Sequence, residues 1–269
     1  MRIRITQLAT GLALAAAIGT ATPAAHAASV NHWVTPDNPA VDVTGNATLT
    51  AVQDNDARGG YEGWAWEADT PGGANYVRFT PIWENLPTGT TVADIARISY
   101  WTNAPEDHPS LNWFFNIYTF AEGDGLDSAG WYRSALTAEP YYADNANAPA
   151  DQWSLWSTDN GTNQLTLFDR NRHHFPYDGA TLEELGDGAT SWGWDYADEL
   201  VRGIQFGVGD TGAGWDASGL RLDGIEIELV DGTTLTHNLV PLPAAAWAGL
   251  ALLGAMGGVT GVKRKLRRN

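Results

Sequence analysis

The sequence has no cysteine and almost no lysine. Without cysteine, its 269 residues can form no disulfide bond, thiolate metal site or cysteine nucleophile. Lysine occurs only at positions 263 and 265, so residues 28–240 carry eight arginines against 32 acidic residues, a net charge of −24. Such an acidic segment repels phosphate backbones, and we therefore expect no nucleic-acid partner. Hydrated cations, neutral glycans and cationic partners all suit this charge.

Signature motifs of several enzyme classes are missing as well. The sequence has no Gly-x-Ser-x-Gly, no His-Glu-x-x-His, no phosphate-binding loop and no dinucleotide fingerprint. What it does contain is an apolar, aromatic composition, with 43% hydrophobic residues and 13 tryptophans. A chain of this composition can build a core and is not disordered.

Short runs rich in β-branched and aromatic residues alternate with turn residues between positions 47 and 239. This pattern predicts an all-β fold, an antiparallel β-sandwich or jelly roll occupying residues 28–239 as one domain. Residues 28–45 are expected to form a lead-in or edge strand, and a turn is expected at 91–95. The one expected helix has Thr181 as its cap and Gly186 as its stop. The expected strands are 47–52, 76–83, 97–103, 111–120, 131–137, 152–156, 165–168, 201–207, 220–229 and 233–239.

Two of these strands indicate where the core lies. Residues 111–120 are apolar on both faces, which predicts a strand in the middle of a covered sheet. In residues 220–229 the alternation shifts phase between Leu222 and Ile225. A β-bulge at Asp223 and Gly224 would keep the apolar side chains on both sides of it inward.

Both ends of the chain have the composition of targeting segments. Residues 1–27 begin with Arg2 and Arg4, continue through an apolar stretch and end in Ala25-His26-Ala27, a small-x-small cleavage pattern. We interpret them as a secretory signal peptide; a buried first helix is the alternative. Residues 240–269 contain an uncharged stretch, 244–262, whose helix would be about 28 Å long, enough for a transmembrane helix. Basic residues follow this stretch, and the positive-inside rule keeps them cytoplasmic, so the acidic domain faces outward.

The C-terminal pattern resembles the PEP-CTERM sorting signal in its Val-Pro-Leu-Pro-Ala form. The resemblance implies recognition by a membrane exosortase, removal of the tail, and delivery to the cell surface or an extracellular polysaccharide matrix. A permanent membrane anchor and a core helix are the alternatives for this segment. The residues that match the signal are Val240, Pro241, Leu242, Pro243, Ala244, Lys263, Arg264, Lys265, Arg267 and Arg268.

A second resemblance concerns the domain itself and spans residues 80–235. Four short stretches, 98–102, 115–119, 131–133 with 139–140, and 222–225, are similar to a domain that recurs among PEP-CTERM cargo proteins. This resemblance implies a jelly roll. It brings no catalytic residue with it.

Two acidic clusters are candidate Ca²⁺ sites. Glu122, Asp124 and Asp127 place three carboxylates within six residues, with glycines that permit a tight loop. Asp54 and Asp56 form a second, smaller cluster. A solvated acidic turn is the alternative for both.

Tryptophan pairs beside carboxylates are the candidate carbohydrate-binding residues. Trp64 and Trp66 precede Glu67, and Trp192 and Trp194 precede Asp195. In an extended segment each pair would lie on one side, and flat rings beside carboxylates suit a neutral polysaccharide. Core packing is the alternative for each ring.

Three further acidic or histidine groups are candidates for glycan chemistry. Glu226 and Glu228 would lie on one strand face about 7 Å apart, a spacing that a glycosidase pair could use. The pair at 183–184 diverges on a helix, and the pair at 173–174 with Asp169 could form a metal site or a catalytic base. Solubility and surface loops are the alternative explanations. We therefore expect an exported, non-catalytic protein that binds polysaccharide with or without Ca²⁺; a glycan hydrolase or lyase and a purely structural surface or adhesive module are the alternatives.

Overall fold

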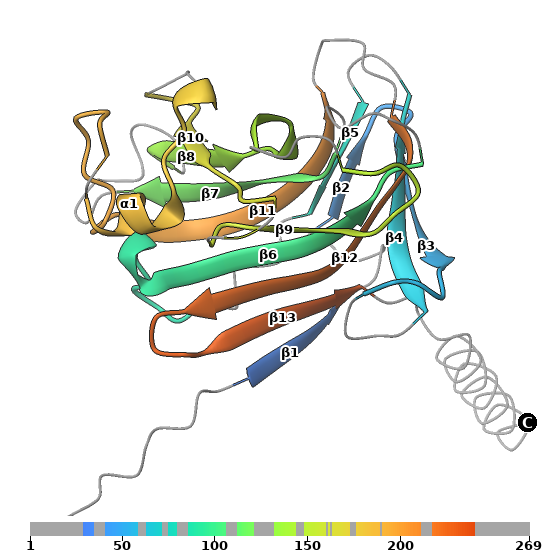
Figure 1. The fold of residues 1–269 in the computed structure, drawn as a ribbon, viewed down its shortest axis with the longest axis horizontal. Helices are drawn as coiled ribbons and strands as arrows, with labels where there is room; N and C mark the ends of the chain where they lie inside the picture. Colours follow the sequence, from blue (N-terminus) through green and yellow to red (C-terminus); the bar gives the residue numbers. More distant parts are fainter. Residues whose placement is uncertain are drawn as a thin grey trace, which may run out of the picture.

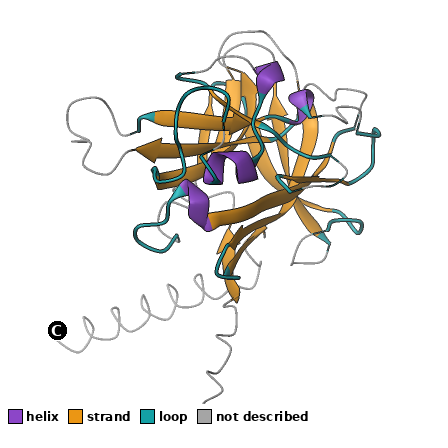
Figure 2. Cartoon of the chain, turned by 60° about the vertical axis from the view of Figure 1, so that its left-hand side comes forward, coloured by secondary structure: helices purple, strands orange, loops and turns teal. Residues whose placement is uncertain are grey.

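Two β-sheets lie face to face in the computed structural model of this chain (Figure 1). Among the described residues, strands dominate and each helix is about one turn long (Figure 2). The predicted all-β class and sandwich-like arrangement are confirmed. The structure describes residues 29–34, 41–58, 63–71, 75–79, 86–105, 112–120, 132–143, 148–159, 161, 163–172, 176–188, 190–210 and 217–239.

The first sheet has seven strands arranged around β12 (Ala217–Leu229). Along one edge, β12 pairs with β4 (Trp64–Thr70) in its first half and with β13 (Thr234–Leu239) in its second half. Along its other edge it pairs with β6 (Ile95–Asn103). The remaining strands pair further out: β3 (Thr48–Gln53) with β4, β9 (Ser154–Ser157) with β6, and β1 (Ser29–Val34) with β13. The pairing of β1 with β13 is parallel, whereas the other pairings of this sheet are antiparallel.

The second sheet has six strands, all paired antiparallel. Its edges are β10 at one side and β2 at the other, so both strands of the expected N-terminal lead-in, β1 and β2, are edge strands. The order across the sheet is β10 (Leu167–Asp169), β8 (Ser134–Ala138), β7 (Phe114–Phe120), β11 (Leu200–Asp210), β5 (Asn75–Phe79) and β2 (Val41–Thr44).

Both predictions about the core strands are confirmed. β7 lies mid-sheet between β8 and β11, with Phe115 and Ile117 fully buried. In β12 the register shifts between Asp223 and Glu226, and Gly224 adopts a positive φ of 58°. This bulge leaves the apolar residues before and after it on the same, buried face.

Several predicted boundaries need correction. No strand was expected at β4, which the structure forms from Trp64–Thr70. The expected strand at 76–83 is described only as β5, and residues 80–85 lie outside the described residues. Helix α1 (Leu182–Gly186) begins after its Thr181 cap as expected, but Gly186 belongs to the helix instead of ending it. Three further short helices lie within the described ranges: η1 (Val92–Asp94), at the expected turn, η2 (Pro140–Tyr142) and η3 (Pro176–Asp178).

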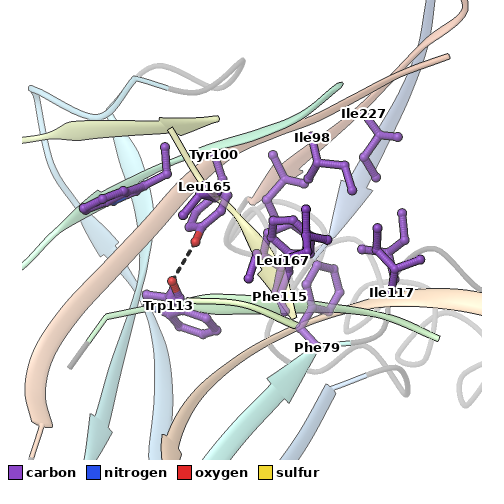
Figure 3. Packing of buried hydrophobic residues seen from close by; sticks show 14 of the residues in the cluster. Phe79, Ile98, Tyr100, Trp113, Phe115, Ile117, Leu165, Leu167 and Ile227 are labelled. Atoms are coloured by element: carbon purple, nitrogen blue, oxygen red, sulfur yellow. Dashed lines mark hydrogen bonds between the residues drawn. The ribbon is translucent and has the colours of Figure 1, made fainter. Parts of the chain in front are cut away.

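Aromatic side chains fasten the two sheets together. Tyr100 of β6 donates its hydroxyl hydrogen to the carbonyl of Trp113, 2.8 Å away (Figure 3). The indole nitrogen of Trp113 donates in turn to the carbonyl of Leu220, at 3.1 Å. The ring of Tyr100 also meets Phe206 of the second sheet edge-to-face, with centroids 5.2 Å apart. Burial raises the pKa of Tyr100 well above its usual value, so it stays a hydrogen-bond donor.

The two predicted targeting segments lie outside the described residues, because the structure describes nothing before residue 29 or after residue 239. Within the described ranges, no helix has both the length and the apolar character needed to cross a bilayer.

Candidate functional site: an exposed tryptophan over a buried ion-pair network

The segment between α1 and β11 borders an open pocket of about 680 Å³. We call it the Trp194 pocket. Its wall combines one indole ring, two guanidinium groups and three carboxylates, a mixture that offers a flat apolar surface together with hydrogen-bond donors and acceptors. The residues that carry these groups are Arg133, Arg172, Trp194, Asp195, Asp198 and Glu199.

The chain turns sharply between the two predicted sugar-binding indoles of this segment. Gly193, between them, has a φ of 75°, a conformation that glycine adopts without strain. Trp192 is turned inward: its indole nitrogen donates to the carbonyl of Asp178 at 3.0 Å, and its ring meets Tyr196 edge-to-face. Trp194 is 46% exposed. The expectation that both rings share one side of an extended segment is therefore wrong, because Trp192 is packed and Trp194 is presented to solvent.

Arg172 supports the ring of Trp194 from below. Its guanidinium carbon lies 4.8 Å from the centroid of the Trp194 ring and 5.6 Å from that of Tyr196. These distances permit cation–π attraction to both rings. Arg172 therefore lies over one face of the indole, and its side chain is only 12% exposed, whereas Trp194 is 46% exposed.

A buried network holds Arg172 in place. Glu199, only 5% exposed, accepts hydrogen bonds from Nη1 of Arg172 at 2.9 Å, from the hydroxyl of Ser134 at 3.0 Å and from the hydroxyl of Thr119. Buried carboxylates need such partners, since an unpaired charge is costly away from water. Nη2 of Arg172 is buried and has no hydrogen-bond partner among the described residues.

Asp169 is the second buried carboxylate of the network. It accepts hydrogen bonds from the hydroxyl of Tyr196 at 2.9 Å and from the backbone N–H of Asn171 at 2.8 Å. Nε of Arg172 lies 3.9 Å from the same carboxylate. Burial and the neighbouring carboxylate raise the pKa of Tyr196 well above its usual value, so Tyr196 remains a donor to Asp169.

The second pair of predicted sugar-binding tryptophans lies elsewhere. Trp64 is half-buried at the start of β4, and Trp66 is fully buried in the core, where its ring meets Phe79 of the opposite sheet at 4.9 Å. Trp66 has no ring surface left for a ligand, so the prediction that it contacts sugar is wrong. β4 pairs with β3 and β12, and the face of β4 that carries Trp66 points into the interior of the sandwich.

Of the two acidic clusters predicted to bind Ca²⁺, the structure describes only the smaller one. Glu122, Asp124 and Asp127 lie outside the described residues, so the main site stays a prediction. Asp54 is bound to Arg221 through a contact of 2.9 Å and also accepts the backbone N–H of Asp56. Within the described ranges, no cluster of three or more acidic or histidine side chains is arranged to hold a metal ion.

The other candidates for glycan chemistry have structural roles where the structure describes them. Arg97 forms ion pairs with both Glu226 and Glu228 on the face of β12, so these two carboxylates have a structural partner. Glu184 caps α1 by accepting the backbone N–H of Thr181. The histidine pair at 173–174 lies outside the described residues.

Sequence reasoning missed most of the polar residues of the Trp194 pocket. Arg172 and Glu199 are 27 residues apart, and nothing in either local sequence links them. Two exposed tyrosines, Tyr141 and Tyr177, were also missed. Each follows a proline at the start of a one-turn helix, and this repeated Pro-Tyr turn could have indicated presented rings.

Comparison with known proteins gives no family for this chain. No protein-family model and no curated protein matches it. Among solved structures it is similar to the enzymatically active domain of tailspike protein 4 of bacteriophage CBA120, with 10% identity and a TM-score of 0.35, covering 71% of this chain and 19% of that one. It is also similar to a family 11 carbohydrate-binding module of a Clostridium thermocellum cellulosomal cellulase, with 13% identity and a TM-score of 0.32, covering 68% and 85%.

A third similar structure is SGBP-B from a complex xyloglucan utilization locus of Bacteroides uniformis, with 15% identity and a TM-score of 0.29. The match covers 72% of this chain and 48% of that one. These TM-scores are too low to assign a shared fold.

Proposed function

We propose that this chain is an exported, non-catalytic surface or extracellular-matrix protein that binds polysaccharide through the Trp194 pocket. The observation that carries the proposal is a 46% exposed indole, supported underneath by Arg172 and bordered by carboxylates. A sugar ring stacks its C–H face on such a surface, while its hydroxyls exchange hydrogen bonds with carboxylates and guanidinium groups.

The contacts and the exposure of the pocket carboxylates favour binding over hydrolysis. A glycosidase needs one carboxyl group kept protonated and a second one free to act as base or nucleophile. Glu199 is instead held by Arg172 and two hydroxyl donors, and both Asp195 and Asp198 are exposed. Incubation of retained polysaccharide with the protein, followed by an assay for new reducing ends, separates a binding protein from a glycan-active enzyme.

Replacing Trp194 by alanine is expected to lower affinity for the retained polysaccharide by about tenfold or more, which is about 1.4 kcal/mol. The indole supplies the stacking surface, and its exposed position means that the fold survives its removal. Affinity gel electrophoresis against a panel of soluble neutral polysaccharides measures the effect.

Trp64→Ala is the matched control, because it removes the same side chain from a half-buried position on β4. It should leave retention unchanged. Equal loss in both variants would contradict a role specific to Trp194. If the wild-type protein retains no polysaccharide, the structural or adhesive function replaces the proposed one.

The proposed route to the surface has its own test. Replacing Pro241 and Pro243 by alanine alters the box but keeps the apolar stretch and the basic cluster. If an exosortase reads the box, the variant accumulates in the membrane with its tail uncut, while the wild-type chain is shortened and reaches the surface. Immunoblots of membrane and surface fractions distinguish the two. A wild-type chain that stays inside the cell, soluble and uncut at both ends, would overturn the proposal.

A further inference from the structure

Three aromatic side chains are far more exposed than packing requires. Tyr141, Tyr177 and Trp194 are 41%, 82% and 46% exposed, the highest values among the aromatic residues whose exposure the structure describes. Exposing a large ring to water forgoes its burial energy, so three exposed rings in one region call for an explanation.

The two tyrosines belong to one cluster with Tyr142, which we call the tyrosine patch. The ring of Tyr142 meets Tyr141 at 4.9 Å and Tyr177 at 5.1 Å, both edge-to-face. Beneath it lies Phe168 of β10, at 5.8 Å. These ring contacts restrict the side chains before any ligand arrives, which reduces the side-chain entropy lost on binding.

A continuous series of contacts leads from the tyrosine patch to the Trp194 pocket. Tyr177 is followed by Asp178, whose carbonyl accepts the indole N–H of Trp192. Trp192 then meets Tyr196 at 5.9 Å. Tyr196 and Trp194 both contact the guanidinium group of Arg172. The three exposed rings are therefore connected through contacts within the protein, by way of the packed Trp192 and the buried Tyr196, and they come from η2, η3 and the segment before β11.

We propose that the tyrosine patch and the Trp194 pocket are two subsites of one track for an extended, uncharged polysaccharide chain. This inference rests on the proposed function and specifies its ligand. One sugar ring covers one aromatic platform, so two platforms separated by the packed Trp192 suit a polymer and not a short sugar. Engaging both subsites with one chain raises affinity by effective concentration, without any new contact at either subsite.

The charges along the track favour a neutral chain. Arg170, beside the patch, is paired with Glu139 at 3.4 Å, and Arg172 is paired with Glu199. Both positive charges are thus compensated within the protein. A third arginine, Arg133, lines the Trp194 pocket together with Asp195 and Asp198, so carboxylates outnumber guanidinium groups in the pocket wall. Residues 28–240 as a whole carry a net charge of −24. Uronic acid or sulfated chains would be repelled by it, whereas hydroxyl groups are accommodated.

The test is a chain-length series on the full exported protein. A panel of neutral polysaccharides identifies one that is retained, and its oligosaccharides, from disaccharide to octasaccharide, are then titrated by calorimetry. The double variant Tyr141→Ala/Tyr177→Ala is expected to lose about tenfold or more in octasaccharide affinity and to keep the wild-type disaccharide affinity. Trp194→Ala is expected to weaken both ligands. Tyr177→Phe keeps the ring and should keep the affinity.

The outcomes separate this inference from the proposed function. If no polysaccharide is retained, both fall together. If polysaccharide is retained but affinity does not rise with chain length, or the tyrosine double variant binds the octasaccharide normally, the track is refuted and the Trp194 pocket stands alone. Stronger binding of polygalacturonate than of any neutral chain would overturn the charge argument. Thermal melting of each variant checks that these exposed positions leave the fold unchanged.

Discussion

Arg172→Met is expected to lower the free energy of unfolding by about 3–5 kcal/mol. The substitution removes the guanidinium group that forms an ion pair with Glu199 and lies near Asp169. Both carboxylates then remain buried without this positive charge. An unpaired charge in the interior is far more costly than the intact pair is stabilising. Urea unfolding followed by tryptophan fluorescence measures the change. The variant should also bind polysaccharide less well, because Trp194 loses the group that supports it.

The double variant Arg172→Met/Glu199→Gln is the decisive control. It removes the unpaired charge of Glu199 as well, so it should recover a large part of the stability lost in the single variant. Arg170→Met is the matched surface control: the Arg170–Glu139 pair is half-exposed on the arginine side and should cost at most about 1 kcal/mol. Equal instability of the single and double variants would show that the network does not act as an ion pair.

Trp66→Ala is expected to destabilise the protein by about 3–5 kcal/mol. The side chain is fully buried against Phe79, and its removal leaves a cavity between β4 and the opposite sheet. The same substitution at Trp194 should cost less than about 1 kcal/mol, because that residue is 46% exposed and lies outside the core. Denaturant unfolding of the two variants side by side gives the comparison.

The same pair of variants tests the assignment of the sugar site. The folded fraction of Trp66→Ala should bind polysaccharide with wild-type affinity, whereas Trp194→Ala should be stable but deficient. If Trp66→Ala were instead stable and deficient in binding, the sugar site would have to be assigned to β4.

The two tryptophan pairs show where prediction from sequence ends. Both segments contain two indoles separated by one residue and followed by an acid, yet Trp66 is core and Trp194 is surface. β4 becomes a strand because β3 and β12 supply backbone partners on both sides. The segment at Trp194 turns instead at Gly193. Local sequence does not encode which partners arrive, so alternation alone could not distinguish the two cases.

Where local alternation and packing agreed, prediction succeeded. The two apolar faces of β7 placed it mid-sheet, and the phase shift at Asp223 located the bulge of β12. Both signals arise from the strand period of two residues, which is a property of neighbouring positions. The Arg172–Glu199–Asp169 network is different, because tertiary structure alone brings its members together.

The parallel pairing of β1 with β13 has a mechanical consequence. Leu239 ends β13 and adjoins Val34, while Ser29 lies at the other end of the same ladder, beside Thr234 (Figure 1). A pull directed along β13 from Leu239 acts at right angles to the hydrogen bonds that join β13 to the antiparallel β12, and across the slanted hydrogen bonds that join it to the parallel β1. Those bonds share the load and must break together, since shear gives no free end from which to unzip. A domain tethered through this strand would resist drag far better than one whose terminal hairpin is peeled from the sheet edge.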